Sequence, residues 1–494
     1  MVAQRRVAVI GGGVSGLGTA YHLTDTARRS PVPADPGLLV TVFEAEPRLG
    51  GKVATEVVAG LPVDTGPDAV MVRAPAAFRL LEELGLDPLR REPAGTGAFV
   101  WARGRLRPLP MGSMFGVPDR LLPLLRSGLV GPIGFVRAGA DLVLPRRECP
   151  EADPTIEQLL RPRFGRQVYE HLIEPMLGGV HAGRASRLSA RSAVPEVSAL
   201  IAGHRSLYLA LRARGSHSSG SRSSGSRSSG PRPTGPRSSG AALVSLDGGL
   251  DRLIDALRVA IMHAPGARVL TGTAVTSVRR TGRCYAVLAD GMAPLEVDDV
   301  VIATQAWEAA RLLGPLAPAA APQAAAIPYA GVATVTLAYP PSAIGRALDG
   351  TGFLVPPSEH RLLVGCSWLT AKWPQLRSDR VAVLRCMVGR DGDQAWAELD
   401  DARLTAAVRA ELAASMGVSG EPLEVHVRRM PRAMPQYTVG HGDRLAAIEA
   451  ALAGLPGVWL TGAGYRGVGI AGCLGQAETV AAAVLSRSLE TVTA

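Results

Sequence analysis

Glycines at fixed spacing give this chain its clearest chemical signal, because they let a phosphate-bearing ligand approach the backbone. The apolar run 7–10 leads into Gly11-x-Gly13-x-x-Gly16. In such a motif the first glycine permits a tight turn, the second admits a diphosphate, and the third lets a helix pack on a strand. The N–H groups that begin the following helix would face the diphosphate. The motif predicts a dinucleotide site, and a turn that serves packing alone is the alternative.

An acidic residue and a second glycine pair extend this candidate site. Glu44 ends the predicted strand 38–43, where a carboxylate would hold a ribose hydroxyl. A proline-rich loop at 28–37 places Glu44 further from the glycines than the usual spacing of about 20 residues. Gly50 and Gly51 would let the backbone come close to a bulky cofactor. Lys52, beside them, is one of only two lysines, and an unliganded exposed glutamate is the alternative reading of Glu44.

Two further turns share this character. Residues 61–68 form a tight turn with two carboxylates, and the segment 457–470 runs from a strand through a glycine turn into a small-residue helix at 471–485. An NAD-dependent dehydrogenase has no reason to return to its first cofactor strand so late in the chain. The last turn is therefore the most discriminating motif.

Composition limits the function classes. The 494 residues predict two or three domains, and the net charge of +10 suits an anionic small molecule or an anionic membrane surface. Basic clusters with interleaved aromatic residues are missing from the sequence, so we expect no nucleic acid partner. Five scattered cysteines lack metal-site spacing, and no run of 18 apolar residues occurs. We expect no metal and a cytoplasmic protein.

The middle of the chain predicts three regions. Residues 76–214 are mostly helical, and within them 119–145 are apolar, broken by glycine and proline, and dotted with arginines. That stretch either lies on a membrane surface or walls a large apolar cavity. A Gly/Ser/Arg repeat at 215–242 predicts a disordered linker. Strands at 332–339, 352–355, 362–367, 381–388 and 423–429 predict an antiparallel sheet that floors a substrate site.

Several of these segments resemble one family. Glu44 with RLGGK and DTGPD resembles the flavin-binding amine oxidase superfamily. LIEPMLGGVHAG at 172–183, GVATVTLAYP at 331–340, MPQY at 434–437 and YRGVGI at 465–470 resemble the bacterial coproporphyrinogen and protoporphyrinogen oxidases. The resemblance covers nearly the whole chain apart from 24–37 and 215–240.

The resemblance implies an α/β fold with a discontinuous Rossmann-like FAD-binding domain, an α+β substrate domain and a helical subdomain. We expect the FAD-binding domain at 1–75, 243–312 and 430–494, the helical subdomain at 76–214 and the substrate-binding sheet at 313–429. It implies noncovalent FAD, held by the first turn, by Glu44 and by the later turns. The expected cofactor contacts are Gly11, Gly12, Gly13, Val14, Ser15, Gly16, Glu44, Ala45, Arg48, Gly51, Lys52, Gly66, Pro67, Asp68, Ala69, Val275, Val468, Gly469 and Ile470.

Other residues carry weaker hypotheses. Arg73 could pair with a substrate carboxylate, or be one more solvated arginine among 51. His181 stands where the family usually has a tyrosine, and we interpret it as structural. Cys473 could attach FAD covalently, as in some amine oxidases, but an inert buried thiol is the preferred interpretation. No side chain stands out as a catalytic base.

By resemblance, the reaction is the six-electron, oxygen-dependent oxidation of coproporphyrinogen III to coproporphyrin III in haem biosynthesis, with release of hydrogen peroxide. Protoporphyrinogen IX oxidation, another flavin oxidase or desaturase activity, and a flavin-holding scaffold without turnover are the alternatives. Expected partners are the porphyrinogen, molecular oxygen and a ferrochelatase that receives the product. The expected location is the cytoplasm, with peripheral contact to the inner face of the membrane as an addition.

Overall fold

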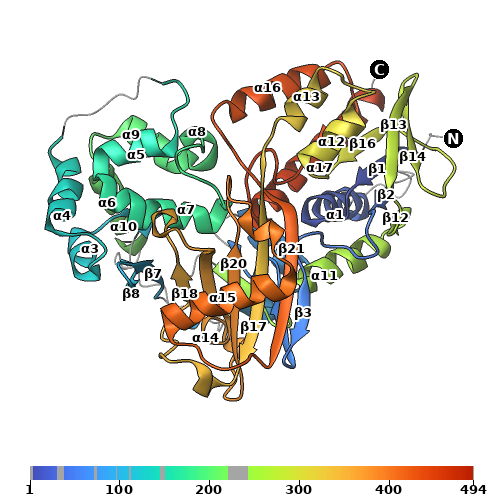
Figure 1. Ribbon diagram of the computed structural model, residues 1–494. Coiled ribbons are helices and arrows are strands. Elements are labelled where there is room, and N and C mark those ends of the chain that lie inside the picture. Colours follow the sequence, from blue (N-terminus) through green and yellow to red (C-terminus); the bar gives the residue numbers. More distant parts are fainter. Residues whose placement is uncertain are drawn as a thin grey trace, which may run out of the picture.

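The computed structural model describes residues 4–29, 38–71, 75–95, 97–110, 113–144, 151–220 and 243–492. Figure 1 shows three regions around a central junction: a nucleotide-type domain on the right, a sheet below and helices on the left. The predicted contact Arg73 and the tract 221–242 lie outside the described residues.

A parallel five-stranded sheet forms the nucleotide-type domain, in the order β12-β2-β1-β16-β22. Its strands alternate between two cores: Val7 and Val9 of β1 face one apolar cluster, and Ala8 and Ile10 face another. Both faces are covered, which explains the continuous apolar run before the first glycine. The strands are β1 (Arg6–Ile10), β2 (Leu39–Phe43), β12 (Ala267–Leu270), β16 (Asp299–Ile302) and β22 (Val458–Leu460).

Helices form the outer layers of this domain. One side is packed with α1 (Val14–Arg29), α2 (Pro75–Glu83), α11 (Asp251–Met262) and α17 (Ile470–Val492). The other side carries α12 (Ala306–Leu313), α13 (Ala320–Ala325), α16 (His441–Leu452) and the antiparallel strands β13 (Val275–Thr281), β14 (Cys284–Ala289) and β15 (Leu295–Val297). Small strands join the domain to its neighbours: β3 (Thr55–Val58), β4 (Leu61–Asp64), β5 (Val70–Met71), β6 (Arg90–Arg91) and β11 (Leu243–Leu246).

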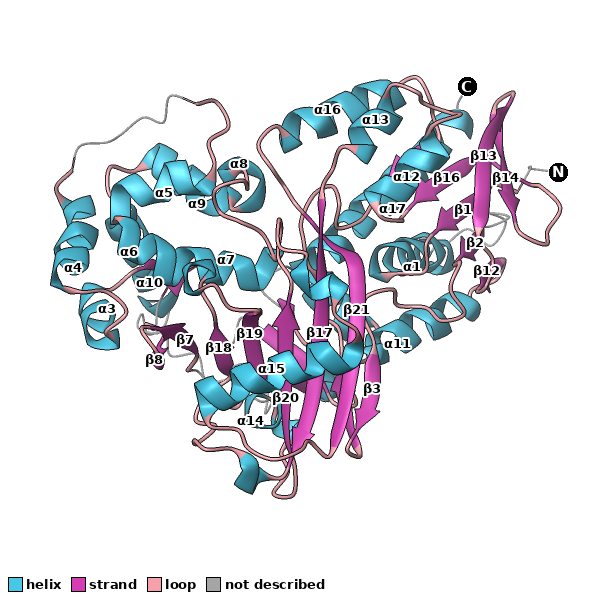
Figure 2. Ribbon diagram, in the orientation of Figure 1, coloured by secondary structure: helices cyan, strands magenta, loops and turns pink. Residues whose placement is uncertain are grey.

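A seven-stranded sheet lies beneath, in the order β21-β17-β20-β19-β18-β7-β8 (Figure 2). The helix α15 (Asp401–Met416) covers one face through Leu404, Val408 and Leu412. The opposite face carries side chains that reach the nucleotide-type domain. The strands are β7 (Phe99–Ala102), β8 (Arg105–Pro108), β17 (Tyr329–Tyr339), β18 (Gly352–Leu354), β19 (Leu363–Trp368), β20 (Ala382–Val388) and β21 (Glu424–Pro435), with α14 (Leu369–Lys372) after β19.

The helical region has its own apolar core, which includes Leu124, Phe164 and Leu177. Its elements are β9 (Ser113–Met114), β10 (Val117–Pro118), α3 (Leu121–Ser127), α4 (Pro132–Gly139), η2 (Ala140–Leu142), α5 (Ile156–Phe164), α6 (Arg166–Val168), the π-helical turn η3 (Tyr169–Ile173), α7 (Glu174–His181), α8 (Ala190–Ala193), α9 (Pro195–Gly203) and α10 (Leu207–Gly220).

Three predicted boundaries differ from the structure. The helix α2 packs on α17 in the nucleotide-type core rather than in a helical subdomain at 76–214, because its apolar face of Ala77, Leu80 and Leu81 meets that core. The hairpin β7–β8 extends the lower sheet, since β7 pairs in parallel with β18. The helix α10 also continues past the predicted start of the linker at 215.

Candidate functional site

The first glycine turn has the geometry that its spacing predicts. Gly11 has a φ of 111°, and its N–H donates to Phe43 O at 2.8 Å. A Cβ on Gly16 would lie 1.8 Å from Gly11 O, so helix and strand could not approach this closely with any other residue. A Cβ on Gly13 would have no neighbouring atom within 4 Å. The second glycine thus borders open space at the start of α1, where the N–H groups of the first turn have no helical partners.

The carboxylate of Glu44 lies directly against this turn. Gly12 N–H donates to Glu44 Oε2 at 2.7 Å, and Glu46 N–H donates to Oε1 at 2.9 Å. A Cβ on Gly12 would lie 2.9 Å from the Cβ of Glu44, so glycine is needed for the approach. Ala45, the next residue, is exposed. The strand end therefore presents a fixed carboxylate beside the open space at Gly13.

The second turn packs on the first through its backbone. Gly50 N–H donates to Gly12 O at 2.9 Å, and a Cβ on Gly51 would lie 3.6 Å from the Cα of Gly13. Arg48 folds back and donates to Val53 O at 2.9 Å and to Gly51 O. The predicted contact Arg48 thus holds its own turn in shape.

Lys52 lies near residues of both the first helix, α1, and the last helix, α17. Burial lowers the pKa of its ammonium, while the nearby Cys473 on α17 acts in the opposite direction. Burial in turn raises the pKa of the Cys473 thiol, which lies against Ser15 on α1. Raised thiol pKa values disfavour the reactive thiolate. Residues from three separate segments therefore meet at the beginning of α1.

The third turn, which contains the predicted contacts Gly66, Pro67, Asp68 and Ala69, is held by the lower sheet. Lys372 Nζ lies 2.7 Å and Trp373 Nε1 2.9 Å from Asp68 Oδ2, and Arg385 Nη2 lies 3.0 Å from Oδ1. Burial alone would raise the pKa of Asp68, but Arg385 and Lys372 hold it well below its usual range. Both carboxylate oxygens of Asp68 thus bind other side chains of the protein. Any contact of this segment with a cofactor would therefore use atoms other than these two oxygens.

Three side chains from one face of the sheet, Arg385 among them, donate to backbone carbonyls of the turns. Arg385 donates to Asp64 O and Gly66 O at 2.8 and 2.6 Å. Thr334 Oγ1 donates to Thr65 O at 2.8 Å. Arg428 donates to Gly51 O and Lys52 O at 3.0 and 3.1 Å. They share a face because Thr334 pairs directly with Arg428, and its i+2 neighbour Thr336 pairs with Arg385.

Sequence reasoning missed Thr334, Arg385 and Arg428. The available signal was an arginine inside an otherwise apolar strand, as in Leu384-Arg385-Cys386. In a chain with 51 arginines that signal carries little weight. Only the strand register shows that these residues face the glycine turns.

A second buried carboxyl, Asp64, adjoins this clamp. Its Oδ1 accepts from Thr55 Oγ1 at 2.6 Å and from Leu250 N–H at 2.9 Å. Burial raises the pKa of Asp64 to about 6, against these two hydrogen bonds. Asp64 and Asp68 thus lie in one turn, but their pKa values are shifted in opposite directions.

The fourth turn brings the end of the chain to the same place. Gly462 and Gly469 have φ values of 135° and 90°, and α17 begins at Ile470. The helices α1 and α17 pack closely, since a Cβ on Gly18 would lie 3.1 Å from Ala477. Val468 packs against the core of the helical region, and Ile470 packs in the nucleotide-type core. This turn therefore lies where the two regions meet.

Two further candidates, Val275 and His181, lie in elements outside the four turns. Val275 begins β13, and its carbonyl accepts from Arg311 at 2.7 Å. His181 is buried at the end of α7, and burial lowers its pKa to about 4, so the ring is neutral at neutral pH. Among the described ranges, no group of histidine, cysteine, aspartate or glutamate side chains could hold a metal ion.

The turns fit an FAD molecule on the evidence of their shape. A nucleotide diphosphate needs open space at a helix N-terminus, and Gly13 borders such space. A ribose needs a carboxylate at the end of the second strand, where Glu44 stands. A reduced flavin ring is stabilised by a helix N-terminus, and α17 starts beside the first site.

Comparison with known proteins agrees with this geometry. Residues 14–485 match the family described as flavin containing amine oxidoreductase. The chain is 30% identical over 484 residues to the coproporphyrinogen III oxidase of Bacillus subtilis, with 98% of each chain covered. It is 35% identical to that of Propionibacterium freudenreichii, covering 98% of this chain and 91% of the relative. It is 29% identical to the protoporphyrinogen oxidase of Bos taurus, with 97% and 98% covered.

Solved structures share the architecture. A crystal structure of an Exiguobacterium protein named after protoporphyrinogen oxidase superposes with a TM-score of 0.81 at 29% identity, covering 98% of this chain and 99% of that one. A putrescine oxidase superposes at 0.62 with 17% identity, with 98% and 99% covered, a likeness of fold alone. The expected α/β architecture, with a parallel sheet typical of a Rossmann-like domain, is confirmed.

Proposed function

We propose that this chain, which belongs to the flavin-containing amine oxidoreductase family, is an oxygen-dependent porphyrinogen oxidase that converts coproporphyrinogen III to coproporphyrin III. The observation that carries the proposal is end-to-end similarity to relatives named for that activity, from organisms as distant as Bacillus and Propionibacterium. The convergence of four turns at one place supports the cofactor half of the proposal.

The cofactor in this proposal is noncovalent FAD. Its diphosphate would lie against Gly11 to Gly16, its ribose on Glu44, and its ring beside Val468, Gly469 and Ile470. Bound FAD supplies hydride acceptance and the passage of electron pairs to molecular oxygen. Removal of six electrons from the substrate then consumes three oxygen molecules and releases three of hydrogen peroxide. Cys473 supports noncovalent binding, because its thiol is buried against Ser15 and its pKa is raised.

The protein's own contribution is geometry. Lys372 and Arg385 hold the third turn, and Arg428 holds the second, so the lower sheet fixes the position of the turns relative to its own face. The substrate would lie between that face and the flavin, with its reacting carbon at about 3–3.5 Å from the flavin ring. We propose no catalytic base from the described residues, and proton loss would go to solvent.

An amine substrate is less well supported by the residues near the last turn. Amine oxidation in this superfamily would favour an aromatic cage at the flavin, and Tyr465 is the aromatic residue of that turn. Tyr465 is buried and belongs to the apolar cluster that also includes Ala306 and Ile448. Protoporphyrinogen IX, with two carboxylates rather than four, is the nearer alternative, since the bovine relative is named for it.

The location that we propose is the cytoplasm, with reversible attachment to the inner face of the membrane. No helix among the described residues is both long and apolar enough to cross a bilayer. The product would pass to a metal-inserting enzyme such as a ferrochelatase.

Anaerobic stopped-flow spectroscopy tests the proposed reaction. Purified protein with its bound flavin would be mixed with coproporphyrinogen III or protoporphyrinogen IX while flavin absorbance is followed. We expect faster bleaching with coproporphyrinogen III. Faster bleaching with protoporphyrinogen IX would make that compound the preferred substrate in place of coproporphyrinogen III. No bleaching above a substrate-free control would overturn the porphyrinogen oxidase proposal.

A further inference from the structure

Two buried side chains between the lower sheet and α16 hold the backbone of the last glycine turn. We call residues 436–441 the connector, which leads from the end of β21 to the start of α16, at the junction of the three regions (Figure 1). Tyr437 Oη donates to Ala463 O at 2.7 Å, and His441 Nε2 lies 2.9 Å from Tyr465 O. The connector thus binds two alternate carbonyls of the last turn.

The two side chains form one unit because their rings are stacked. The ring centroids of Tyr437 and His441 are 4.1 Å apart, the ring planes are 14° from parallel, and both residues are buried. The Tyr437 hydroxyl also hydrogen-bonds the backbone of Gly467, where φ is 100°. Val468, the next residue, packs against the apolar core that contains Tyr437. Tyr437 therefore contacts the last turn directly before the residues expected beside the flavin ring.

His441 binds the turn as a neutral ring with one hydrogen. Burial lowers its pKa, while the bond to Tyr465 O and the charge of Asp153 act in the opposite direction and Arg444 and Arg466 lower it further. A carbonyl oxygen only accepts, so the hydrogen is on Nε2. Among the described residues, Nδ1 is buried without a hydrogen-bond partner. The single donor of this ring is therefore directed at the last turn.

The helical region holds the other side of the connector. Asp153, which precedes α5, accepts from Gly440 N–H through Oδ2 at 2.8 Å and from Ser189 Oγ through Oδ1. Ser189 N–H in turn donates to Tyr437 O at 2.8 Å. Backbone and side-chain bonds of the helical region thus fix both ends of the stacked pair.

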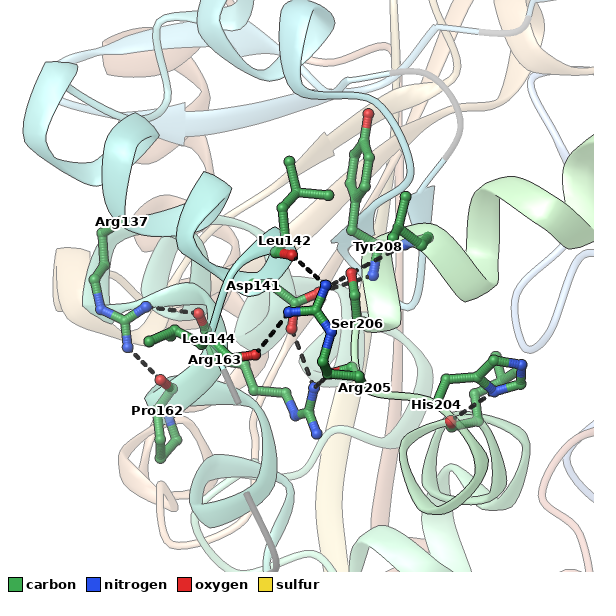
Figure 3. A network of polar contacts seen from close by, with 12 residues as sticks. Arg137, Asp141, Leu142, Leu144, Pro162, Arg163, His204, Arg205, Ser206 and Tyr208 are labelled. Atoms are coloured by element: carbon green, nitrogen blue, oxygen red, sulfur yellow. Dashed lines mark hydrogen bonds and ion pairs between the residues drawn. The ribbon is translucent and has the colours of Figure 1, made fainter. Parts of the chain in front are cut away.

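The anchoring helix α5 is itself fixed at its far end by a buried ion pair (Figure 3). Arg163, in the last turn of α5, binds Asp141 at 3.1 Å, and the other oxygen of Asp141 accepts from Ser206 Oγ at 2.9 Å. Both members of the pair are buried. Loss of either would leave a buried charge unpaired, so the pair keeps this helix in one place.

The last turn also carries the start of α17, whose N–H groups would face the flavin ring. The stabilisation that a helix terminus gives to a reduced, anionic ring falls off within about one turn, so it depends on where this backbone lies. We propose that Tyr437 and His441 are positioning residues for the flavin, which fix the start of α17 against the ring by holding the last turn to the helical region. This inference rests on the proposed function, because that function places FAD at the last turn.

Tyr437→Phe tests the proposal by removing one hydroxyl while keeping the stacked ring. We expect the reduction potential of the bound flavin to become more negative, because the start of α17 is no longer held against the reduced ring. We also expect reduction of the flavin by coproporphyrinogen III to slow by at least about tenfold. Anaerobic equilibration of the holoenzyme with a reference dye measures the potential and needs no substrate.

Tyr285→Phe is the matched control. Tyr285 is buried in the same domain, and its hydroxyl donates to Pro456 O at 2.9 Å, at the opposite end of β22 from the last turn. The control therefore loses a bond of the same kind, and we expect a similar change in melting temperature but the flavin potential of the unaltered chain. An unchanged potential in Tyr437→Phe, or an equal shift in both variants, would overturn the proposal.

Two substitutions of His441 test the donor itself. The side-chain amide of glutamine can place a nitrogen where Nε2 lies, whereas leucine has no donor. We expect His441→Leu to shift the flavin potential in the same direction as Tyr437→Phe, and His441→Gln to restore most of that loss. An equal shift in the two His441 variants would refute the role of the Nε2 bond. If His441→Leu does not fold, the result for Tyr437→Phe decides.

The dye measurement separates this inference from the proposed reaction. If no porphyrinogen reduces the flavin of the unaltered chain, the proposed reaction is wrong, while a shifted potential in Tyr437→Phe still supports the positioning role. If coproporphyrinogen III reduces the flavin but Tyr437→Phe keeps the potential of the unaltered chain, the positioning role alone is wrong.

Discussion

The first glycine turn and the turn at 64–69 lie at the same junction but are held in different ways. The first is set by backbone sterics between residues close in sequence, such as Gly16 against Gly11. The second is held by side chains from strands and loops about 300 residues further along, above all Lys372 and Arg385 on Asp68. One half of the site is therefore determined by local sequence. The other, long-range half forms only when segments far apart in the chain come together in the fold.

The largest expected effect comes from breaking the local half. Gly16→Ala would place a Cβ 1.8 Å from Gly11 O, and backbone cannot yield as a flexible side chain can. We expect a loss of stability of at least about 3 kcal/mol, with failure to retain flavin. Urea unfolding followed by circular dichroism measures the first effect, and the absorbance of the purified protein measures the second.

Gly13→Ala is the matched control for that variant, because its Cβ would have no neighbour within 4 Å. We expect a melting temperature close to that of the unaltered chain but flavin affinity lower by at least about tenfold, since the methyl group occupies the space assigned to the diphosphate. Equal flavin affinity in Gly13→Ala and the unaltered chain would refute the assignment.

The next effect tests the long-range half. Asp68→Asn would leave the buried cations Lys372 and Arg385 without their carboxylate, and we expect a loss of about 3–5 kcal/mol in the free energy of unfolding. The control, Arg79→Gln, breaks an exposed ion pair with Glu478 and should cost less than about 1 kcal/mol. Similar losses in the two variants would show that Asp68 is not a clamp.

A smaller effect separates the two carboxyls of the same turn by pH. The folded pKa of Asp64 is about 6, above the unfolded value of about 3.9. Its contribution to stability is therefore fully present below about pH 4 and is lost as pH rises through 6. Asp64→Asn, which keeps an acceptor for Thr55 and Leu250, should remove this dependence, worth about 2 kcal/mol. Unfolding curves between pH 4 and 7 measure this dependence of the free energy of unfolding on pH. The same dependence in Asp64→Asn and in the unaltered chain would contradict the assignment.

The smallest effect concerns Cys473. Cys473→Ala should retain its flavin, because the thiol is buried against Ser15 and is expected to make no bond to the cofactor. Acid precipitation is expected to release all of the flavin from both proteins into the supernatant. Flavin that stays with the unaltered chain and is released from the variant would establish a covalent bond instead.

These contrasts also mark what could be predicted from the sequence. The glycine turns, the position of Glu44 at the end of a strand and five of the seven strands of the lower sheet were predictable, because residue type constrains local conformation. The sheet strands predicted at 332–339 and 381–388 appear as β17 and β20 with shifts of a few residues.

The remainder depended on tertiary partners. The helix at 75–83 has an apolar face that could join either of two cores, and only its contact with α17 places it. The partners of Asp68 come from segments that no local rule connects to it. The stretch 119–145 was equally compatible with a cavity wall and a membrane surface, because local sequence does not say which of its apolar residues are buried, as Leu124 and Ala138 are, and which are exposed, as Ile133 is.

A crystal structure of the chain with FAD tests the central claim most directly, namely that four turns far apart in sequence form one flavin site. The account predicts the diphosphate at Gly13, a ribose hydroxyl on Glu44, and the flavin ring beside Val468 and the start of α17. A dinucleotide bound away from Gly13 and Glu44, or a ring that does not reach the last turn, would contradict it.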